Sequence, residues 1–442
     1  MDYAQTIEYL YSRLPMFSSQ GQSAIKPGLK NIIRFCDILG DPQKTFKSIH
    51  VAGTNGKGST SHMLAAILQT AGYKTGLYTS PHLRDFRERI RVDGRMISEE
   101  DVINFIAEKR EIIEDIEPSF FETTVALAFH QFAKYRVDIA IIEVGLGGRL
   151  DSTNIIHPEV SVITNIGLDH VNILGNTLQE IATEKAGIIK AGVPVVIGER
   201  RQGVDEVFTS IAARNTSEIV FASDEWDITP IISAGKETGN DGNFQSVNVS
   251  SRTASVGQTP DDGAYIVELD LRGRYQLKNL ATVLSTVDHL RSRGFVIENT
   301  HINTALKNVI PITGLMGRWQ TLSSDPLVIC DTGHNEDGIR EVLKNIMSVS
   351  YNRLHMVIGM VKDKDISKIL QLLPEDATYY FCQPHIPRAM DADSLMKRAL
   401  AEGLTGKAYP SVREALEASK SNASPSDLIF VGGSTFVVAE VV

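Results

Sequence analysis

Short apolar runs alternate with helix-forming segments from residue 47 to residue 198, and this alternation limits the possible folds most. The runs SIHVAG, VDIAIIEVG, EVSVITNIG and PVVIG have the composition of buried strands, and STSHMLAAILQTAG and LQEIATEKAGIIKAG that of helices. Such a chain folds into a parallel sheet with helices on both faces, because each parallel crossover needs a helix-length connection. Since ligands of these sheets bind beyond the strands' carboxyl ends, we expect functional residues directly after the strands.

A second alternation begins at Leu327 with LVICDTG and continues through LHMVIGMV, TYYFCQ and LIFVGGS. The chain has 442 residues, which suits two domains better than one. We predict an α/β domain over residues 1–296, ending after a helix that stops at Gly294, and a smaller α/β domain over residues 297–442. Residues 223–263 are rich in small and polar types and predict a surface meander or β-hairpin insertion in the first domain.

Composition and charge exclude several classes of protein. The chain has 44 Lys and Arg against 54 Asp and Glu, a net charge of −10, so binding to nucleic acid or to an anionic membrane is disfavoured. No apolar stretch approaches membrane-spanning length, and the first residues lack the pattern of a secretory signal. The three cysteines are far apart and form no CxxC motif, as expected for reduced thiols of a cytoplasmic protein.

The segment SIHVAGTNGKGST joins an apolar strand, a loop with three glycines and a lysine, and a helix that starts with hydroxyl residues. This arrangement directs backbone N–H groups at a polyphosphate, lets Lys57 reach the terminal phosphates, and brings a hydroxyl to Mg²⁺. The loop departs from GxxxxGK[ST], because Val51 and Gly58 stand where that pattern has glycine and a hydroxyl. A glycine-rich turn without a ligand is the alternative. The predicted nucleotide-binding residues are Thr54, Asn55, Gly56, Lys57, Gly58, Ser59 and Thr60.

These motifs together carry a family resemblance. HVAGTNGKGST, YTSPHLRDFRERIRVDG, IIEVGLGGRLDSTN, TNIGLDH and EKAGI, followed by MGRWQ, DTGHN, GMVKDKD and GGSTF, resemble the folylpolyglutamate synthase and dihydrofolate synthase branch of the Mur ligase superfamily. The resemblance implies a P-loop ATPase domain followed by a smaller Rossmann-like domain. It also implies a monomer that uses ATP to join L-glutamate to dihydropteroate, to reduced folates, or to both, through an acyl phosphate.

Metal ligands are expected after the strands. Glu143 ends the strand VDIAIIE, where a carboxylate can hold Mg²⁺. The resemblance implies a first Mg²⁺ near Ser59, Ser80 and Glu143, and a second cation, with Mn²⁺ possible, at Glu143, His170 and a carbamylated Lys185. Read without the resemblance, His170 is a structural histidine, Ser80 a turn residue and Lys185 a solvent-facing lysine.

The catalytic residues implied by the resemblance are Lys57, His170 and Lys185. Carbamylation of Lys185 needs a neutral amine, and hence a lowered pKa.

In the second domain, the resemblance implies that Arg318, Asp331 and His334 contact the nucleotide. Arg318 suits a phosphate because its guanidinium is always charged, and an interdomain salt bridge is the alternative. The family more often has alanine where this chain has Gly333. For the acceptor substrate, the resemblance points to Pro81, His82, Phe120, Phe121 and Asp151, although paired phenylalanines are more often core residues.

Three other functions are compatible with parts of the sequence. A cell-wall Mur ligase would share the superfamily, but Gly58 and the SPHL motif favour the folate branch. A P-loop ATPase or phosphotransferase would need no amino acid for turnover. A non-catalytic nucleotide-binding module should have lost Lys57, Glu143 or His170, and the chain retains all three.

Overall fold

The computed structural model describes residues 1–15, 28–231, 244–252, 264–362 and 366–442. The chain forms two compact units. The first comprises the described residues of Met1–Ile231, Phe244–Asp270 and Gln276–Gly314, and the second those of Leu271–Tyr275 and Leu315–Val442. In the part of the chain that is described, no helix has both the length and the apolar character needed to cross a bilayer.

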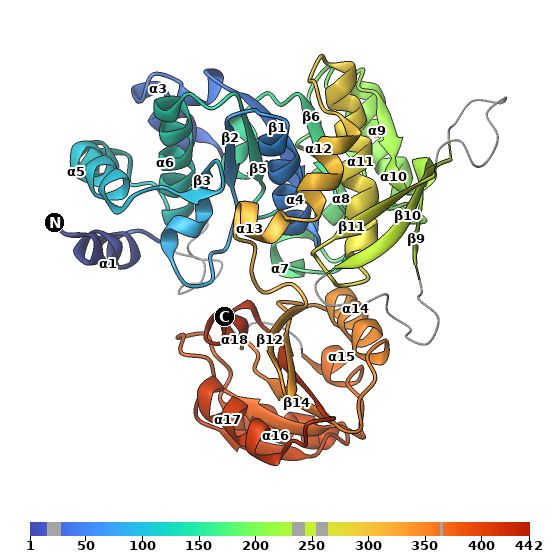
Figure 1. The fold of residues 1–442 in the computed structure, drawn as a ribbon. Coiled ribbons are helices and arrows are strands. Elements are labelled where there is room, and N and C mark those ends of the chain that lie inside the picture. The colour runs from blue at the N-terminus through green and yellow to red at the C-terminus, as the bar shows by residue number, and fades with distance from the viewer. Residues whose placement is uncertain (16–27, 232–243, 253–263, 363–365) are drawn as a thin grey trace. The chain divides into compact units, whose positions relative to one another are not determined.

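The first unit is built on one large sheet (Figure 1). Its strands are β1 (Lys47–Ala52), β2 (Thr75–Tyr78), β3 (Ile90–Val92), β4 (Arg95–Met96), β5 (Ile139–Glu143), β6 (Val160–Ile163), β7 (Val195–Ile197) and β8 (Ile219–Phe221). Their order across the sheet is β4-β3-β2-β5-β1-β6-β7-β8. The six neighbouring strands β2, β5, β1, β6, β7 and β8 pair in parallel, and β3 and β4 add an antiparallel edge beside β2. The predicted parallel sheet is confirmed.

Helices cover both faces of this sheet. One face carries α4 (Lys57–Thr70), α11 (Gln276–Ser292), α12 (Asn299–Leu306) and α13 (Val309–Thr313). The other carries α6 (Phe120–Tyr135), with α3 (Lys30–Ile38) and α5 (Glu99–Ile116) against it, and also α8 (Leu178–Ala186) and α9 (Asp205–Arg214). Smaller helices are α1 (Tyr3–Arg13), η2 (Pro42–Lys44), η3 (Phe86–Arg89), η4 (Ser152–Ile155), α7 (Val171–Leu174) and α10 (Ala222–Glu225). Because helices cover both faces, the central strands β1, β5 and β6 are mostly apolar, and every residue in them except Lys47 is buried.

The predicted insertion near residues 223–263 contains strands. Strands β9 (Trp226–Pro230), β10 (Gln245–Ser251) and β11 (Tyr265–Leu269) form an antiparallel sheet in the order β11-β10-β9. Residues 232–243 and 253–263 of this segment lie outside the described residues. The described part matches the predicted meander.

The second unit has its own sheet. Its strands are β12 (Gln320–Ser324), β13 (Leu327–Cys330), β14 (Leu354–Ile358), β15 (Thr378–Cys382), β16 (Gly406–Tyr409) and β17 (Leu428–Gly432). They lie in the order β12-β13-β17-β14-β15-β16, all parallel except the edge strand β12. One face is covered by α14 (Glu336–Met347), α15 (Ser367–Leu370) and α16 (Ala392–Ala401), and the other by α17 (Val412–Asn422) and α18 (Thr435–Ala439).

The boundary between the units differs from the predicted one. Gly294 does follow the end of α11 and has φ +89°, but residues 297–314 belong to the first unit. There α12 buries Ile302, Ala305 and Leu306 and packs against α4. A glycine ends a helix locally, whereas domain membership depends on which surface covers the next apolar face.

Candidate functional site

The ends of four neighbouring strands bring Ser80, Glu143, His170 and the phosphate loop to one edge of the sheet. Strands β2, β5, β1 and β6 are adjacent and parallel. Ser80 follows β2, Glu143 ends β5, the phosphate loop follows β1, and His170 follows β6. In this register Glu143 pairs with Val51, two residues before Gly53. Residues far apart in sequence therefore share one edge because the crossovers keep the strands parallel.

The phosphate loop is held by the segment after β6. Thr54 exchanges hydrogen bonds with Gly167, its hydroxyl donating to the carbonyl at 3.2 Å and accepting from the N–H at 2.9 Å. The backbone N–H of Asn55 donates to the Asn165 side chain at 2.9 Å. Gly56, at φ +85°, directly precedes Lys57, the first residue of α4. The loop thus enters the helix in a backbone conformation that favours glycine.

Two amide residues of the first turn of α11 also contact this region, and the sequence analysis did not identify them. Gln276 donates from Nε2 to the Ser59 hydroxyl at 3.1 Å and accepts from the Asn279 amide at 2.8 Å. A Cβ on Gly56 would lie 2.3 Å from Asn279 Oδ1. Amides three residues apart at a helix start are the signal that could have identified them, because residues i and i+3 share a helix face.

Lys57 and Lys185 converge on one carbonyl oxygen. The Lys57 Nζ donates to the Gly53 carbonyl at 3.1 Å and to that of Thr54 at 3.2 Å. The Lys185 Nζ donates to the same Gly53 carbonyl at 2.8 Å. Burial, reinforced by the charge of Lys57, lowers the pKa of Lys185 to about 7, with Asp169 and Asp151 acting in the opposite direction. Lys185 is only 4% exposed, so the interpretation as a solvent-facing lysine is wrong.

Close backbone packing positions Lys185. A Cβ on Gly148 would lie 2.8 Å from the Glu184 carbonyl oxygen and 3.0 Å from Lys185 Cα, so glycine lets the loop after β5 run against α8. The Asn154 amide donates to the carbonyls of Arg149 at 3.1 Å and Gly187 at 3.0 Å. This side chain ties the loop to the end of the helix that carries Lys185.

The remaining first-unit groups suit a nucleotide with a divalent cation. Glu143 is 4% exposed, and the Thr60 hydroxyl is buried with no hydrogen-bond partner among the described residues. His170 has φ +50° and immediately precedes α7 as its N-cap residue, with its Nε2 3.9 Å from Asp169. Among the described residues, no three His, Cys, Asp or Glu side chains group as a metal site. The predicted set instead combines one carboxylate and one imidazole with the hydroxyls of Ser59 and Ser80 and a carbamylated Lys185, so most of its ligand atoms are the hard oxygens that Mg²⁺ prefers.

Predicted acceptor residues lie around a buried arginine. Arg89 donates from Nε to His82 Nδ1 at 2.7 Å, and its guanidinium is 5.3 Å from the Phe120 ring centroid. Since the guanidinium only donates, His82 carries its proton on Nε2, which lies 3.2 Å from the Tyr11 hydroxyl. Burial and then the charge of Arg89 lower the pKa of His82 to about 3, so the ring is neutral. Tyr11 on α1 is a neighbour that sequence reasoning missed.

The other acceptor candidates differ in accessibility. Phe120 is 3% exposed, whereas Pro81 is exposed and Phe121 is half-buried beside Tyr78, with 6.2 Å between ring centroids. Asp151 is 5% exposed and accepts four hydrogen bonds, from the N–H groups of Gly145 and Leu146 and from the N–H and hydroxyl of Thr153. Its carboxylate therefore organises its own loop.

In the second unit, Arg318 and His334 both hydrogen-bond to Thr332, the residue that follows Asp331. Arg318 donates to the Thr332 hydroxyl, and His334 Nδ1 donates to the Thr332 carbonyl at 2.9 Å. Asp331 accepts from Gly333 N–H at 2.8 Å, from Trp319 N–H at 2.8 Å and from the Tyr275 hydroxyl at 2.5 Å. Burial raises the pKa of Asp331. Tyr275, which the sequence analysis did not select, thus anchors the segment before α11 to this carboxylate.

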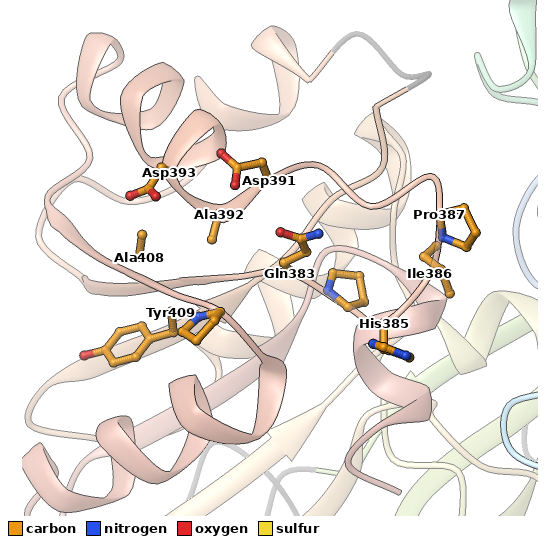
Figure 2. Close-up of a pocket in the computed structure, with 11 residues that line it drawn as sticks. Gln383, His385, Ile386, Pro387, Asp391, Ala392, Asp393, Ala408 and Tyr409 are labelled. Carbon is orange, nitrogen blue, oxygen red and sulfur yellow. The ribbon is translucent and has the colours of Figure 1, made fainter.

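The second unit also contains a cavity of about 560 Å³ beyond the ends of β15 and β16 (Figure 2). Its described lining includes Asp391, Asp393 and His385 but no lysine or arginine. The Asp391 carboxylate accepts from Ser394 N–H at 2.9 Å and caps α16. The predicted site residues do not line this cavity, and its acidic lining does not suit an anionic substrate.

Two family models match this chain, one over each part of the fold. Residues 51–287 match the Mur ligase middle domain, and residues 317–435 match the glutamate ligase domain of Mur ligases. The dihydrofolate synthase/folylpolyglutamate synthase of Bacillus subtilis is 31% identical, with 94% of each chain covered. A probable bifunctional folylpolyglutamate synthase/dihydropteroate synthase of Haloferax volcanii is 34% identical over 100% of this chain, which spans about half (50%) of that relative.

Solved structures agree in fold. Escherichia coli FolC in complex with DHPP and ADP has a TM-score of 0.83 and 30% identity, covering 100% of this chain and 97% of that one. A bifunctional folylpolyglutamate synthase/dihydrofolate synthase with Mn, AMPPNP and L-glutamate bound has a TM-score of 0.81 and 28% identity, covering 100% and 97%. The motifs, the two-unit α/β architecture and these matches agree, and the chain belongs to the folylpolyglutamate synthase and dihydrofolate synthase family of the Mur ligase superfamily.

Proposed function

We propose that the protein is an ATP-dependent ligase that joins L-glutamate to the carboxylate of dihydropteroate, of folate (poly)glutamates, or of both, through an acyl phosphate, releasing ADP and phosphate. The observation that carries the proposal is the convergence of two lysine amines on the Gly53 carbonyl, at the same sheet edge as Glu143. A loop that only binds nucleotide needs one lysine. The second, buried amine suits a site that handles a further reacting group.

Each first-unit residue has a role in this proposal. The N–H groups at the start of α4 and the Lys57 amine would bind the ATP phosphates, and Ser59 and Thr60 would present hydroxyls to the cation. Ser80 and Glu143 would complete a first Mg²⁺ site, with Glu143 and His170 at a second one. Bound cations neutralise the charge that develops on the transferring phosphoryl group. Catalysis then consists of holding the acceptor carboxylate, the γ-phosphate and the glutamate amine in place.

Lys185 is proposed to be carbamylated. Its amine would attack carbon dioxide, forming a C–N bond and releasing one proton, and the resulting carbamate would supply an oxygen ligand for the second cation. The lowered pKa of Lys185, caused by burial and by Lys57, leaves a large share of the amine neutral near pH 7, as this step requires. Mass spectrometry after covalent trapping of carbamates should find the modification at Lys185, and the K185R variant should lack it.

The acceptor proposal rests on the relatives. FolC was solved with DHPP and ADP, and another relative with Mn, AMPPNP and L-glutamate. The Haloferax volcanii relative carries a dihydropteroate synthase in its name, in a polypeptide about twice as long as this chain. A polypeptide that also makes dihydropteroate supports a first glutamate addition to that compound. Pro81, His82, Phe120, Phe121 and Asp151 remain our predictions for the acceptor region, and Arg318, Asp331 and His334 for the nucleotide.

The deciding experiment measures phosphate release from ATP and Mg²⁺ with L-glutamate plus either 7,8-dihydropteroate or a reduced folate monoglutamate, and with each acceptor alone. Release that requires both glutamate and an acceptor supports the ligase, and the acceptor that works identifies the reaction. Release indifferent to glutamate and acceptors would instead indicate a plain ATPase. The K57A variant should lose turnover, because this charge acts on the transferring phosphate.

The proposal includes a monomer in the cytoplasm. All three cysteines, Cys36, Cys330 and Cys382, are buried free thiols, which suits a reducing compartment. Sedimentation at micromolar concentration should give a mass near 48.6 kDa.

A further inference from the structure

A chain of buried hydrogen bonds runs from strand β1 to the loop after β5. His50 on β1 lies with Nε2 2.8 Å from the Thr153 hydroxyl, and that hydroxyl donates to Asp151 Oδ1 at 2.5 Å. His50 and Thr153 are fully buried, and Asp151 is 5% exposed. The chain joins residues 103 positions apart in sequence, and neither His50 nor Thr153 was selected from the motifs.

The donor and the acceptor of each of these hydrogen bonds can be assigned from the available protons. The Thr153 hydroxyl has one proton, which it donates to Asp151, so it accepts from His50. His50 therefore carries its proton on Nε2. Its Nδ1 is buried and finds no hydrogen-bond partner among the described residues, as expected for the bare nitrogen of a neutral ring.

Asp151 connects these hydrogen bonds to the loop that follows Glu143, the predicted metal ligand. While Oδ1 accepts from Thr153, Oδ2 accepts from the N–H groups of Gly145 at 3.1 Å and Leu146 at 2.8 Å. These are the second and third residues after Glu143. Strand β1 continues into Gly53 and the phosphate loop. The hydrogen bonds from His50 through Thr153 to Asp151 therefore connect the loop after Glu143 to the strand that leads into the phosphate-binding residues.

We propose that Thr153 and His50 are positioning residues that set the Glu143 loop relative to the phosphate loop through Asp151. The proposal rests on the ligase function proposed above, in which Glu143 holds the cation. Without the Thr153 hydroxyl, one Asp151 oxygen and the His50 N–H lose buried partners, and the carboxylate is no longer held in one orientation. The loss should therefore appear as weaker cation binding and a looser loop.

The test compares T153V, which keeps the shape and removes the hydroxyl, with T153S, which keeps the hydroxyl. H50L and H50Q form the matching pair, because glutamine retains an N–H donor at similar reach. T286V is the control, since Thr286 is an equally buried threonine whose hydroxyl donates within α11 to Thr282 at 2.7 Å. Thermal unfolding of every variant shows whether the fold is retained.

Two readouts need no turnover. Hydrogen exchange of peptides covering residues 144–151 in the nucleotide-free protein should be faster in T153V and H50L and unchanged in T153S, H50Q and T286V. Nitrogen NMR of labelled histidine should show His50, identified by its loss in H50Q, as a neutral ring protonated at Nε2. A ring protonated at Nδ1, or unchanged loop exchange in T153V, would overturn the proposal even if the protein proves not to be a ligase.

The third readout uses the full chain with ATP, glutamate and acceptor. The Mg²⁺ concentration for half-maximal phosphate release should rise about tenfold in T153V and H50L, with the KM for glutamate unchanged. T153S and H50Q should stay near the unmodified protein. A wild-type Mg²⁺ requirement in T153V also contradicts the proposal. If T153V does not fold, the H50L and H50Q pair provides the same comparison.

Discussion

At the scale of single residues, Gly56 combines a positive φ with a close neighbour at the phosphate loop. Its φ is +85°, and an added Cβ would meet Asn279 Oδ1 at 2.3 Å. Gly40 has a similar φ of +81° but open space around it. G40A should therefore lose only about 1 kcal/mol of stability from backbone strain, with ATP affinity unchanged.

G56A suffers the same strain and in addition displaces Asn279 at the phosphate loop. We expect its ATP affinity, measured by calorimetry, to fall by more than about tenfold, which corresponds to about 1.4 kcal/mol of binding free energy. Equal ATP affinity in G56A and G40A would show that the contact with Asn279 does not matter.

His50 should make the first unit sensitive to acid. Burial, and secondarily the charge of Lys190, lowers the pKa of His50 to about 3, whereas an unfolded histidine titrates near about 6.5. Between these values the unfolded chain binds a proton that the folded chain does not, so stability falls as pH falls from 6.5 towards 3. Above about pH 6.5 both states are neutral and the contribution vanishes.

H50Q should remove this proton from the balance, reducing the pH slope of the unfolding free energy by up to about 1.4 kcal/mol per pH unit. Urea unfolding between pH 6.5 and 4.5, followed by Trp226 fluorescence in a W319F background, reports on the first unit alone. H157Q, at an exposed histidine, is the control. An unchanged slope in H50Q would mean that His50 is protonated in the folded chain.

At the scale of elements, one amide joins the loop after β5 to α8. Asn154 donates to the carbonyl of Arg149, in the loop after β5, and to the carbonyl of Gly187, at the C-terminal end of α8. N154A should destabilise the first unit by about 1–3 kcal/mol and speed hydrogen exchange in Leu178–Ala186. N422A, which removes an amide donor to Tyr380 in the second unit, should leave that exchange unchanged. Slow exchange in N154A would show that packing alone holds α8.

At the scale of the whole molecule, nucleotide binding to the phosphate loop should raise the free energy of unfolding of the first unit. A ligand present at about 100 times its Kd adds about 2.7 kcal/mol to the unit that binds it. Trp226 lies in the first unit and Trp319 in the second, so single-tryptophan variants W319F and W226F report separately. ATP with Mg²⁺ should shift the unfolding midpoint seen by Trp226, and K57A should abolish the shift. No shift with saturating ATP would contradict the assignment of the phosphate loop.

The sequence by itself determined the elements and the ends of the strands. Apolar runs set β1, β5, β6, β13 and β17, because a strand covered on both faces is mostly apolar. The motifs then placed Glu143 at the end of β5, and Lys57 and His170 in the segments that follow β1 and β6, which follows from chain order alone. The edge strands β12 and β16 escaped prediction, since partly exposed strands carry no continuous apolar signal. Strand β2 is buried but has only four residues, Thr75–Tyr78, too few for a clear apolar run.

Only the tertiary structure decided which groups meet and which are buried. Lys185 sits on a helix and looks like a surface lysine, yet packing against Gly148 and the Gly53 carbonyl buries it and lowers its pKa. Gln276 contacts Ser59, which is 217 residues away in the sequence, and His50 contacts Thr153, which is 103 residues away. Local sequence encodes backbone propensity, whereas burial and hydrogen-bond partners are properties of the packed sheet and helices as a whole.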